Sequence, residues 1–245
     1  MTNNILGNME HYMFTQKTLN GLNNNKLISL PISDPPKKKD TLLKVEPELN
    51  KSAFFSIKDN DQLFWCYYIM KYGIIKYQSL LNNTFTDEQR EKIQLVEMLR
   101  NNKELLKKNK WKKNIIEGEL VAKGAISIKT FLCICTMNNL NICIIKERYM
   151  FSKIVDNDSE NNIIIKNDDA YKLSILDRVE KDKLLEEYTK KYWVIDNIDK
   201  PLLTLGAYKL LALQNIASKL KIPIYDTNKK RYRKIELYNM IKSKI

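Results

Sequence analysis

The 245-residue sequence contains a single histidine, His11, and this scarcity limits the enzymes that the chain can form. Most thiol and hydroxyl hydrolases use a histidine to take the proton from their nucleophile. His11 lies in an asparagine-rich stretch, upstream of the candidate nucleophile Cys66. Carboxylates such as Asp168 and Asp169 follow it, but a carboxylate is a poor base toward a thiol of ordinary pKa. The sequence therefore argues against a catalytic triad.

Several other motifs are absent from the chain. It has no phosphate-binding P-loop, no Gly-x-Gly-x-x-Gly turn and no His-Glu-x-x-His zinc motif. The densest apolar stretch, residues 126–145, is interrupted by Lys129 and an asparagine cluster, so no run reaches the roughly 18 residues of a membrane span. The first residues lack the pattern of a secretion signal. We expect a soluble intracellular protein without a membrane partner.

The four cysteines do not form a metal site or a disulfide framework. None belongs to a Cys-x-x-Cys pair, and all lie in apolar surroundings, as expected in a reducing compartment. Cys133 and Cys135 fall two residues apart in a predicted helix, so their side chains point to different faces. We expect buried structural thiols, and we expect neither a metal nor a cofactor.

Positive charge is concentrated at one end of the chain. Residues 200–245 carry eleven lysines and arginines against only Asp226 and Glu236, a balance of +9, whereas the whole chain is +13. The other 199 residues therefore share only +4. A concentration of basic residues on a small module is typical of a surface that contacts phosphates.

The composition divides the chain into three regions. Residues 1–50 are rich in asparagine and lack apolar periodicity, which predicts a loosely attached arm. Residues 51–195 show the dense amphipathic pattern of a folded core. Residues 200–245 follow as a basic module, too short to bury a deep core of its own.

Within the core, helices are predicted first and strands afterwards. Helices are expected over residues 61–72, from an N-cap at Thr86, and over residues 128–137 after a cap at Ser127. Strands are expected at 141–146 and 149–155, which form a hairpin, and then at 161–166 and 171–175, followed by a helix over 176–192. This order predicts an α+β fold with a small, mainly antiparallel sheet.

The basic module is predicted to form a helix, an extended link and a second helix. The helices should cover residues 207–220 and 234–245, with an extended segment at 221–225 and a turn at 226–230. Amides at the start of the second helix and the cations before it would both attract phosphate. Tyr225 and Tyr232 could stack on bases or pack internally, and a protein-docking lobe remains the alternative. The predicted phosphate contacts are Lys229, Lys230, Arg231, Arg233 and Lys234.

Cys66 is the candidate nucleophile for an enzyme. It lies early in the hydrophobic helix that follows Asp61, and a helix N-terminus stabilises a thiolate. The competing interpretation is a small apolar residue packed among Phe64, Trp65 and Tyr67.

Three segments resemble uncharacterised proteins of nucleocytoplasmic large DNA viruses, the giant viruses: DQLFWCYYIMKYG (61–73), ISIKTFLCICTMNNLNICIIKERYMFSKI (126–154) and KPLLTLGAYKLLALQNIASKLKI (200–222). The last 46 residues resemble SAP-like or Rho-N-like modules, which bind DNA or RNA. The core resembles ovarian-tumour-type and papain-like cysteine peptidases in its order of elements. It departs from them because the Asp-Gly-x-Cys signature is absent and because residues 163–171 hold no histidine.

Together these observations predict a non-enzymatic viral protein that binds nucleic acid, DNA in preference to RNA, through its basic module. The resemblance implies a place in the virion or in the virus factory of the host cytoplasm, with other virion proteins as further partners. The alternatives are a cysteine hydrolase that uses Cys66, which the resemblance to peptidases suggests, and a purely structural virion component.

Overall fold

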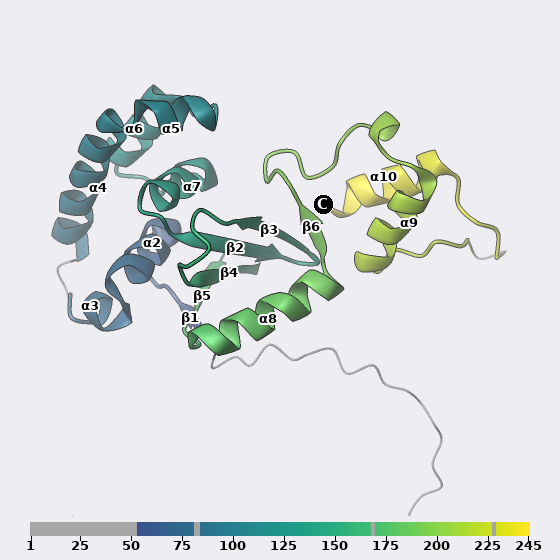
Figure 1. Ribbon diagram of the computed structural model, residues 1–245, viewed down its shortest axis with the longest axis horizontal. Helices are drawn as coiled ribbons and strands as arrows, with labels where there is room; N and C mark the ends of the chain where they lie inside the picture. The colour runs from purple at the N-terminus through teal and green to yellow at the C-terminus, as the bar shows by residue number, and fades with distance from the viewer. Residues whose placement is uncertain (1–52, 81–83, 168–169, 227–228) are drawn as a thin grey trace, which may run out of the picture. The chain divides into compact units, whose positions relative to one another are not determined.

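The computed structural model describes residues 53–80, 84–167, 170–226 and 229–245. Over these residues the chain combines helices with a six-stranded sheet, whose strand order is β1-β5-β4-β2-β3-β6 (Figure 1). The predicted α+β class is therefore confirmed. The arm predicted for residues 1–50 lies outside the described residues.

Helices occupy most of the chain before the sheet. They are α2 (Gln62–Tyr72), α3 (Ile74–Gln78), α4 (Thr84–Asn101), α5 (Lys103–Lys108), α6 (Lys113–Val121) and α7 (Ile128–Met137). Ser127 caps α7 as predicted, its hydroxyl accepting from the backbone N–H of Thr130 at 3.4 Å. The predicted cap at Thr86 is wrong, because α4 already begins at Thr84 and Thr86 lies inside it. Asp87, an acidic residue in the first turn of α4, stabilises the positive end of the helix dipole there.

The sheet is mixed. Its strands are β1 (Phe54–Ser56), β2 (Asn141–Lys146), β3 (Tyr149–Lys153), β4 (Asn161–Asn167), β5 (Ala170–Ser174) and β6 (Trp193–Ile195). The predicted β2–β3 hairpin is confirmed, but β2 pairs with β4 in parallel, and so does β3 with β6. The remaining two pairings, β1–β5 and β4–β5, are antiparallel. The expected mainly antiparallel sheet thus has a parallel pair at its centre, because β3 ends beside the start of β2 and β4 begins at the same end of the sheet.

Both faces of the sheet are covered, which explains the unbroken apolar runs of the central strands. On one face Ile142, Ile144 and Ile164 belong to the main core, to which α2 and α7 also contribute. On the other face Cys143 and Ile165 pack with Tyr188, which lies on α8 (Arg178–Lys191). Figure 1 shows α8 running along this second face.

The C-terminal region contains the predicted helix pair. A short 3₁₀ turn, η3 (Leu205–Ala207), precedes α9 (Leu210–Lys219), and α10 (Lys234–Lys244) follows the link. The predicted single helix from residue 207 is therefore wrong at its start, since regular helix begins at Leu210. Fully buried side chains of both helices, including Leu213 and Leu237, form their contact. The boundary drawn at residue 200 stays a prediction.

Candidate functional site

The link between α9 and α10 folds back on itself. Tyr225 and Arg231 form an antiparallel bridge. The backbone N–H of Tyr232 donates to the carbonyl of Ile224 at 3.1 Å, and that of Asp226 donates to the carbonyl of Lys230 at 2.9 Å. We call residues 221–226 and 229–234 the basic hairpin. The predicted extended link is thus one arm of this hairpin, and the predicted phosphate contacts lie on its other arm.

The five predicted contacts are accessible. Lys229, Lys230, Arg231 and Arg233 are exposed and Lys234 is half-buried. Within the part of the chain that the structure describes, none of the five forms an ion pair with an acidic side chain.

The two tyrosines of the basic hairpin differ in their surroundings. Alternate residues of an extended chain point to opposite sides, so Tyr232 packs against the core while Arg231 and Arg233 point outward. Tyr225 is 50% exposed, and the guanidinium carbon of Arg231 lies 5.7 Å from its ring centroid. Of the two roles considered, Tyr232 has a packing role, while the ring of Tyr225 remains accessible for stacking.

The start of α10 differs from the expectation of a free anion site. Its N-cap residue is Arg233, whose backbone N–H donates to a carboxylate oxygen of Glu236 at 2.6 Å. A carboxylate of the same helix therefore already occupies part of the positive N-terminus. Attraction of phosphate at this place rests on the cationic side chains.

Cys66 does not reach any cleft. It lies in the second turn of α2 with no exposed surface, and burial, together with the nearby charge of Asp61, raises the pKa of its thiol. Burial likewise raises the pKa of Cys133 to about 12, and of Cys143 to about 12. The interpretation of Cys66 as a small core residue agrees with this burial. A thiolate is disfavoured there, because the helix dipole must overcome complete desolvation.

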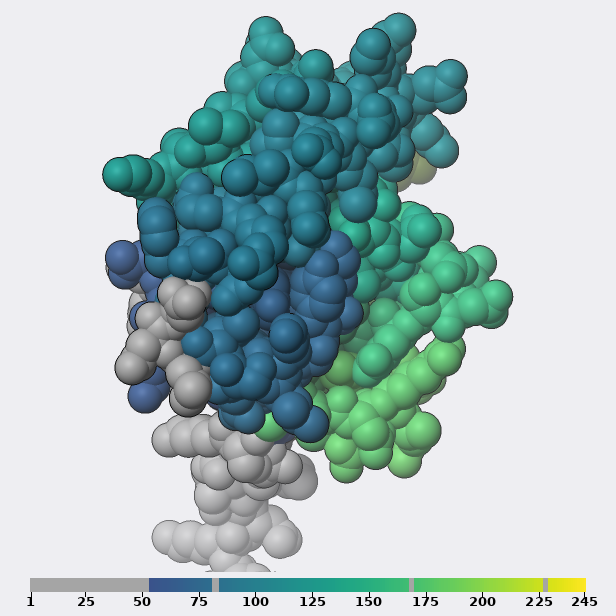
Figure 2. Space-filling model, turned by 90° about the vertical axis from the view of Figure 1, so that its left-hand side faces the viewer, coloured from purple at the N-terminus to yellow at the C-terminus, as the bar shows by residue number. Residues whose placement is uncertain are grey.

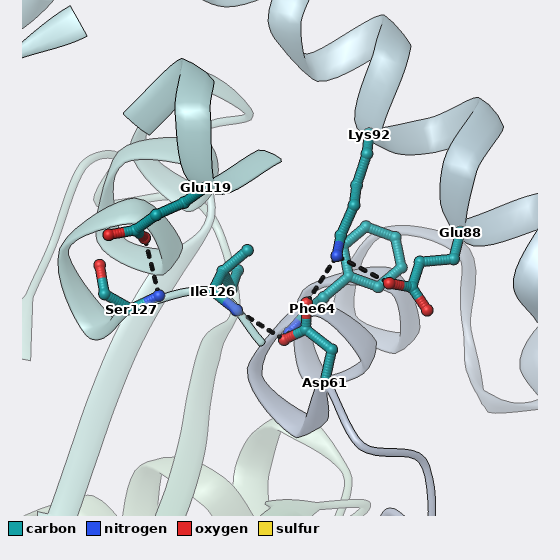
Figure 3. A network of polar contacts seen from close by, with 7 residues as sticks. All are labelled: Asp61, Phe64, Glu88, Lys92, Glu119, Ile126 and Ser127. Carbon is teal, nitrogen blue, oxygen red and sulfur yellow. Dashed lines mark hydrogen bonds and ion pairs between the residues drawn. The ribbon is translucent and has the colours of Figure 1, made fainter. Parts of the chain in front are cut away.

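The N-terminus of α2 is held by a buried polar network (Figure 3). One oxygen of Asp61 accepts from the backbone N–H groups of Phe64 at 3.3 Å and Ile126 at 3.1 Å. The other oxygen lies 2.7 Å from the ammonium of Lys92, which reaches Glu88 at the same distance. Asp61 thus ties α2 to α4 and to the segment before α7, which is a structural role.

A cleft of about 510 Å³ opens beside this network. Its floor includes a transverse row of side chains on the α2 and α7 face of the sheet: Tyr171 (β5), Lys166 (β4), Lys146 (β2) and Tyr149 (β3). The strand register makes each a direct neighbour of the next, since Lys166 pairs with both Tyr171 and Lys146, and Lys146 pairs with Tyr149. We call these four residues the Tyr-Lys-Lys-Tyr row.

Each of the two lysines of the row lies close to an aromatic ring. The Lys146 ammonium lies 5.6 Å from the ring centroid of Tyr149, and that of Lys166 lies 5.3 Å from the ring of Tyr171. Lys146 also donates to the main-chain oxygen of Ile245 at 3.5 Å. Its hydrogen bond with the Tyr149 hydroxyl is the first cause of a raised pKa, so Lys146 stays charged at neutral pH.

Gln62, the first residue of α2, lines this cleft. It is the residue of α2 that occupies the place expected for a nucleophile at the start of this helix. Its side-chain oxygen accepts from the backbone N–H of Tyr171 at 2.7 Å. An amide held in this way is no nucleophile, and Cys66 lies one turn deeper. Sequence reasoning missed this cleft, although one signal was present: a lysine directly follows an isoleucine run in each of two strands, at positions 146 and 166.

Comparison of the chain with protein-family models, with curated proteins and with solved structures finds no match to any of them. The resemblances to giant-virus proteins, to SAP-like modules and to cysteine peptidases therefore stay predictions. No helix of the described ranges is both long and apolar enough to cross a bilayer. The same ranges contain no group of three or more histidine, cysteine or acidic side chains that could hold a metal ion.

Proposed function

We propose that this protein binds nucleic acid, DNA in preference to RNA, through the basic hairpin, without catalysing a reaction. The observation that carries the proposal is the set of five cations at residues 229–234, whose side chains form no ion pair with an acidic side chain among the described residues. One of them, Arg231, lies beside the exposed ring of Tyr225. The resemblance to giant-virus proteins supports a place in the virion or the virus factory, where viral nucleic acid is the abundant polyanion.

The chemistry of the basic hairpin fits phosphate better than base edges. Lysine ammonium groups act as mobile point charges, whereas the guanidinium groups of Arg231 and Arg233 can each hold a phosphate with two hydrogen bonds. Contacts of this kind position a protein on nucleic acid without reading its sequence. The exposed Tyr225 adds a surface on which an unpaired base can stack. We therefore expect binding with little sequence preference.

Charge reversal of the five residues tests the proposal. The full-length variant with Glu at positions 229, 230, 231, 233 and 234 should lose binding to duplex DNA, measured by fluorescence anisotropy, because phosphate contacts become repulsive. For the native protein, the logarithm of the association constant should fall linearly with the logarithm of salt concentration, with a slope of roughly −0.9 for each phosphate neutralised. Binding that ignores salt, or no binding to any nucleic acid, would reject the proposal.

A matched control separates the basic hairpin from net charge. Lys103, Lys107, Lys108, Lys110 and Lys112 are exposed on α5 and the turn after it. This part of the chain is coloured teal at the top of Figure 2. Reversing these five changes the charge of the protein by the same amount. We expect this control to keep most of its affinity. Equal losses in both variants would show that only the overall charge matters. Association with viral proteins but not with nucleic acid would favour the docking lobe.

A further inference from the structure

The two lysines of the Tyr-Lys-Lys-Tyr row are like charges held side by side in the sheet. Like charges placed directly opposite on neighbouring strands destabilise a sheet. Lys146 and Lys166 are such a pair, because they are partners in the parallel β2–β4 register. Among the described residues no acidic side chain forms an ion pair with either lysine. Methionine at both positions would fill the same space without the repulsion.

The surroundings of the row have the dimensions of a ligand site. The cleft of about 510 Å³ lies in the range typical of small-molecule pockets, which is roughly 300–1,000 Å³. It lies where the parallel strands β2 and β4 end, next to the first residues of α2 and α7. A crevice at the carboxyl ends of parallel strands is a common position for ligands in sheets of this kind.

Asp61, the acidic residue that lines the cleft, does not pair with the lysines of the row. Asp61 lines the cleft, but it is only 4% exposed, and its two oxygens are occupied by two backbone N–H groups and by Lys92. The half-buried lysines line the cleft with a tyrosine at each end of the row, and Lys146 has a 3.5 Å hydrogen bond to the oxygen of Ile245 besides. An incoming group would meet ammonium donors in the middle and aromatic rings beside them.

We propose that this cleft binds a small phosphate-bearing molecule, with Lys146 and Lys166 as the phosphate-binding residues. Two adjacent ammonium groups match the charge of a phosphate monoester near neutral pH. Tyr149 and Tyr171 flank the phosphate on either side, each within reach of an attached organic group. This site is separate from the basic hairpin and serves a different ligand. The limited volume of the cleft selects a small molecule over a polymer.

Titration calorimetry of the full-length protein with pyrophosphate and with adenosine 5′-monophosphate tests the site, and sodium sulfate at equal ionic strength controls for general anion effects. Lys146→Met and Lys166→Met should each weaken binding roughly tenfold, because each removes one charge-assisted hydrogen bond. The double variant should show no binding. Lys172→Met is the matched control, since residue 172 alternates to the opposite face of β5, and it should bind like the native protein.

Thermal unfolding without ligand separates binding from folding. Because removal of like charges relieves repulsion, the double variant should melt at the same temperature as the native protein or higher. A lower melting temperature would make the lysines structural and overturn the proposal. Absence of binding to both phosphate probes, or equal binding by the double variant, would also overturn it.

A competition experiment distinguishes this site from the proposed function. The protein with the basic hairpin reversed should lose DNA binding and keep its affinity for pyrophosphate. If an oligonucleotide displaces pyrophosphate from that variant, the cleft is a nucleic-acid site and the small-molecule assignment is wrong. If instead both proteins bind pyrophosphate and neither binds DNA, the cleft assignment stands and the proposed function fails.

Discussion

The contact between α2 and α4 contains buried charged side chains. Lys92 is 1% exposed, and its ammonium meets Asp61 and Glu88 and lies 5.1 Å from the ring centroid of Phe64. Glu91, one position earlier, accepts from the hydroxyls of Tyr67 at 2.9 Å and Tyr72 at 2.8 Å. A buried charge is tolerated only while its partners remain, so these residues are sensitive to substitution.

Replacement of Lys92 tests this dependence. In Lys92→Met the carboxylate of Asp61 stays buried without its cation, so we expect the free energy of unfolding to fall by about 3–5 kcal/mol. Urea denaturation followed by circular dichroism measures the change. Lys190→Met removes an ion pair in which both side chains are about three-quarters exposed, and it should have almost no effect. Equal small effects in both variants would contradict the structural role given to Lys92.

At the scale of elements, the sequence predicted where helices and strands lie. It did not predict which strands pair with one another. The cap at Ser127 was predicted to the residue because a serine hydroxyl and a nearby backbone N–H decide it within one turn. The cap predicted at Thr86 was wrong because α4 already includes Thr84, so the helix begins before the predicted cap. Alternation and apolar runs located four strands, but β1 and β6 have only three residues each and give no periodic signal.

The candidate sites differ in the same way. The five cations of the basic hairpin are neighbours in the sequence, so composition alone revealed them. Lys146 and Lys166 lie twenty positions apart and meet only because β2 and β4 pair in parallel. An antiparallel pairing of these strands would have put Lys146 opposite the other end of β4. The cleft could therefore not be predicted before the topology was known.

The first turn of α10 allows a test at the level of one element. Glu236 holds the N–H of Arg233 and places a negative charge among the cations of the basic hairpin. Glu236→Gln should strengthen DNA binding roughly threefold, as expected for removal of one like charge within a Debye length. It should lower the free energy of unfolding by no more than about 1 kcal/mol. Fluorescence anisotropy and urea denaturation give the two values.

The matched control for this change is Glu186→Gln, which removes an exposed acid from α8. It should leave DNA affinity unchanged. A similar gain in both variants would indicate an effect of net charge and would contradict the local explanation.

For the whole molecule, buried neutral thiols and phenols predict a loss of stability in alkali. Burial raises the pKa of Cys143 from 9.0 to about 12 and also raises those of Cys66, Tyr67 and Tyr188. The folded state therefore keeps protons that the unfolded chain releases. The contribution of these groups to the free energy of unfolding is fully present below about pH 9. It falls as the pH rises toward 12, by about 1.4 kcal/mol per pH unit for each such group.

Urea denaturation at pH 7, 8, 9 and 10 measures this slope. Cys143→Val removes one titrating thiol from the core and should reduce the slope between pH 9 and 10 by one proton. Stability that stays constant or increases up to pH 10 would show that these groups are not buried as described.

Both outer strands of the sheet are short. β1 and β6 lie at its two edges and each contributes only three residues, so the sheet ends with few unpaired backbone groups. Long free edges invite other chains to add strands and so promote aggregation. Short edge strands therefore leave neighbouring copies of the protein little backbone with which to pair, even at high concentration.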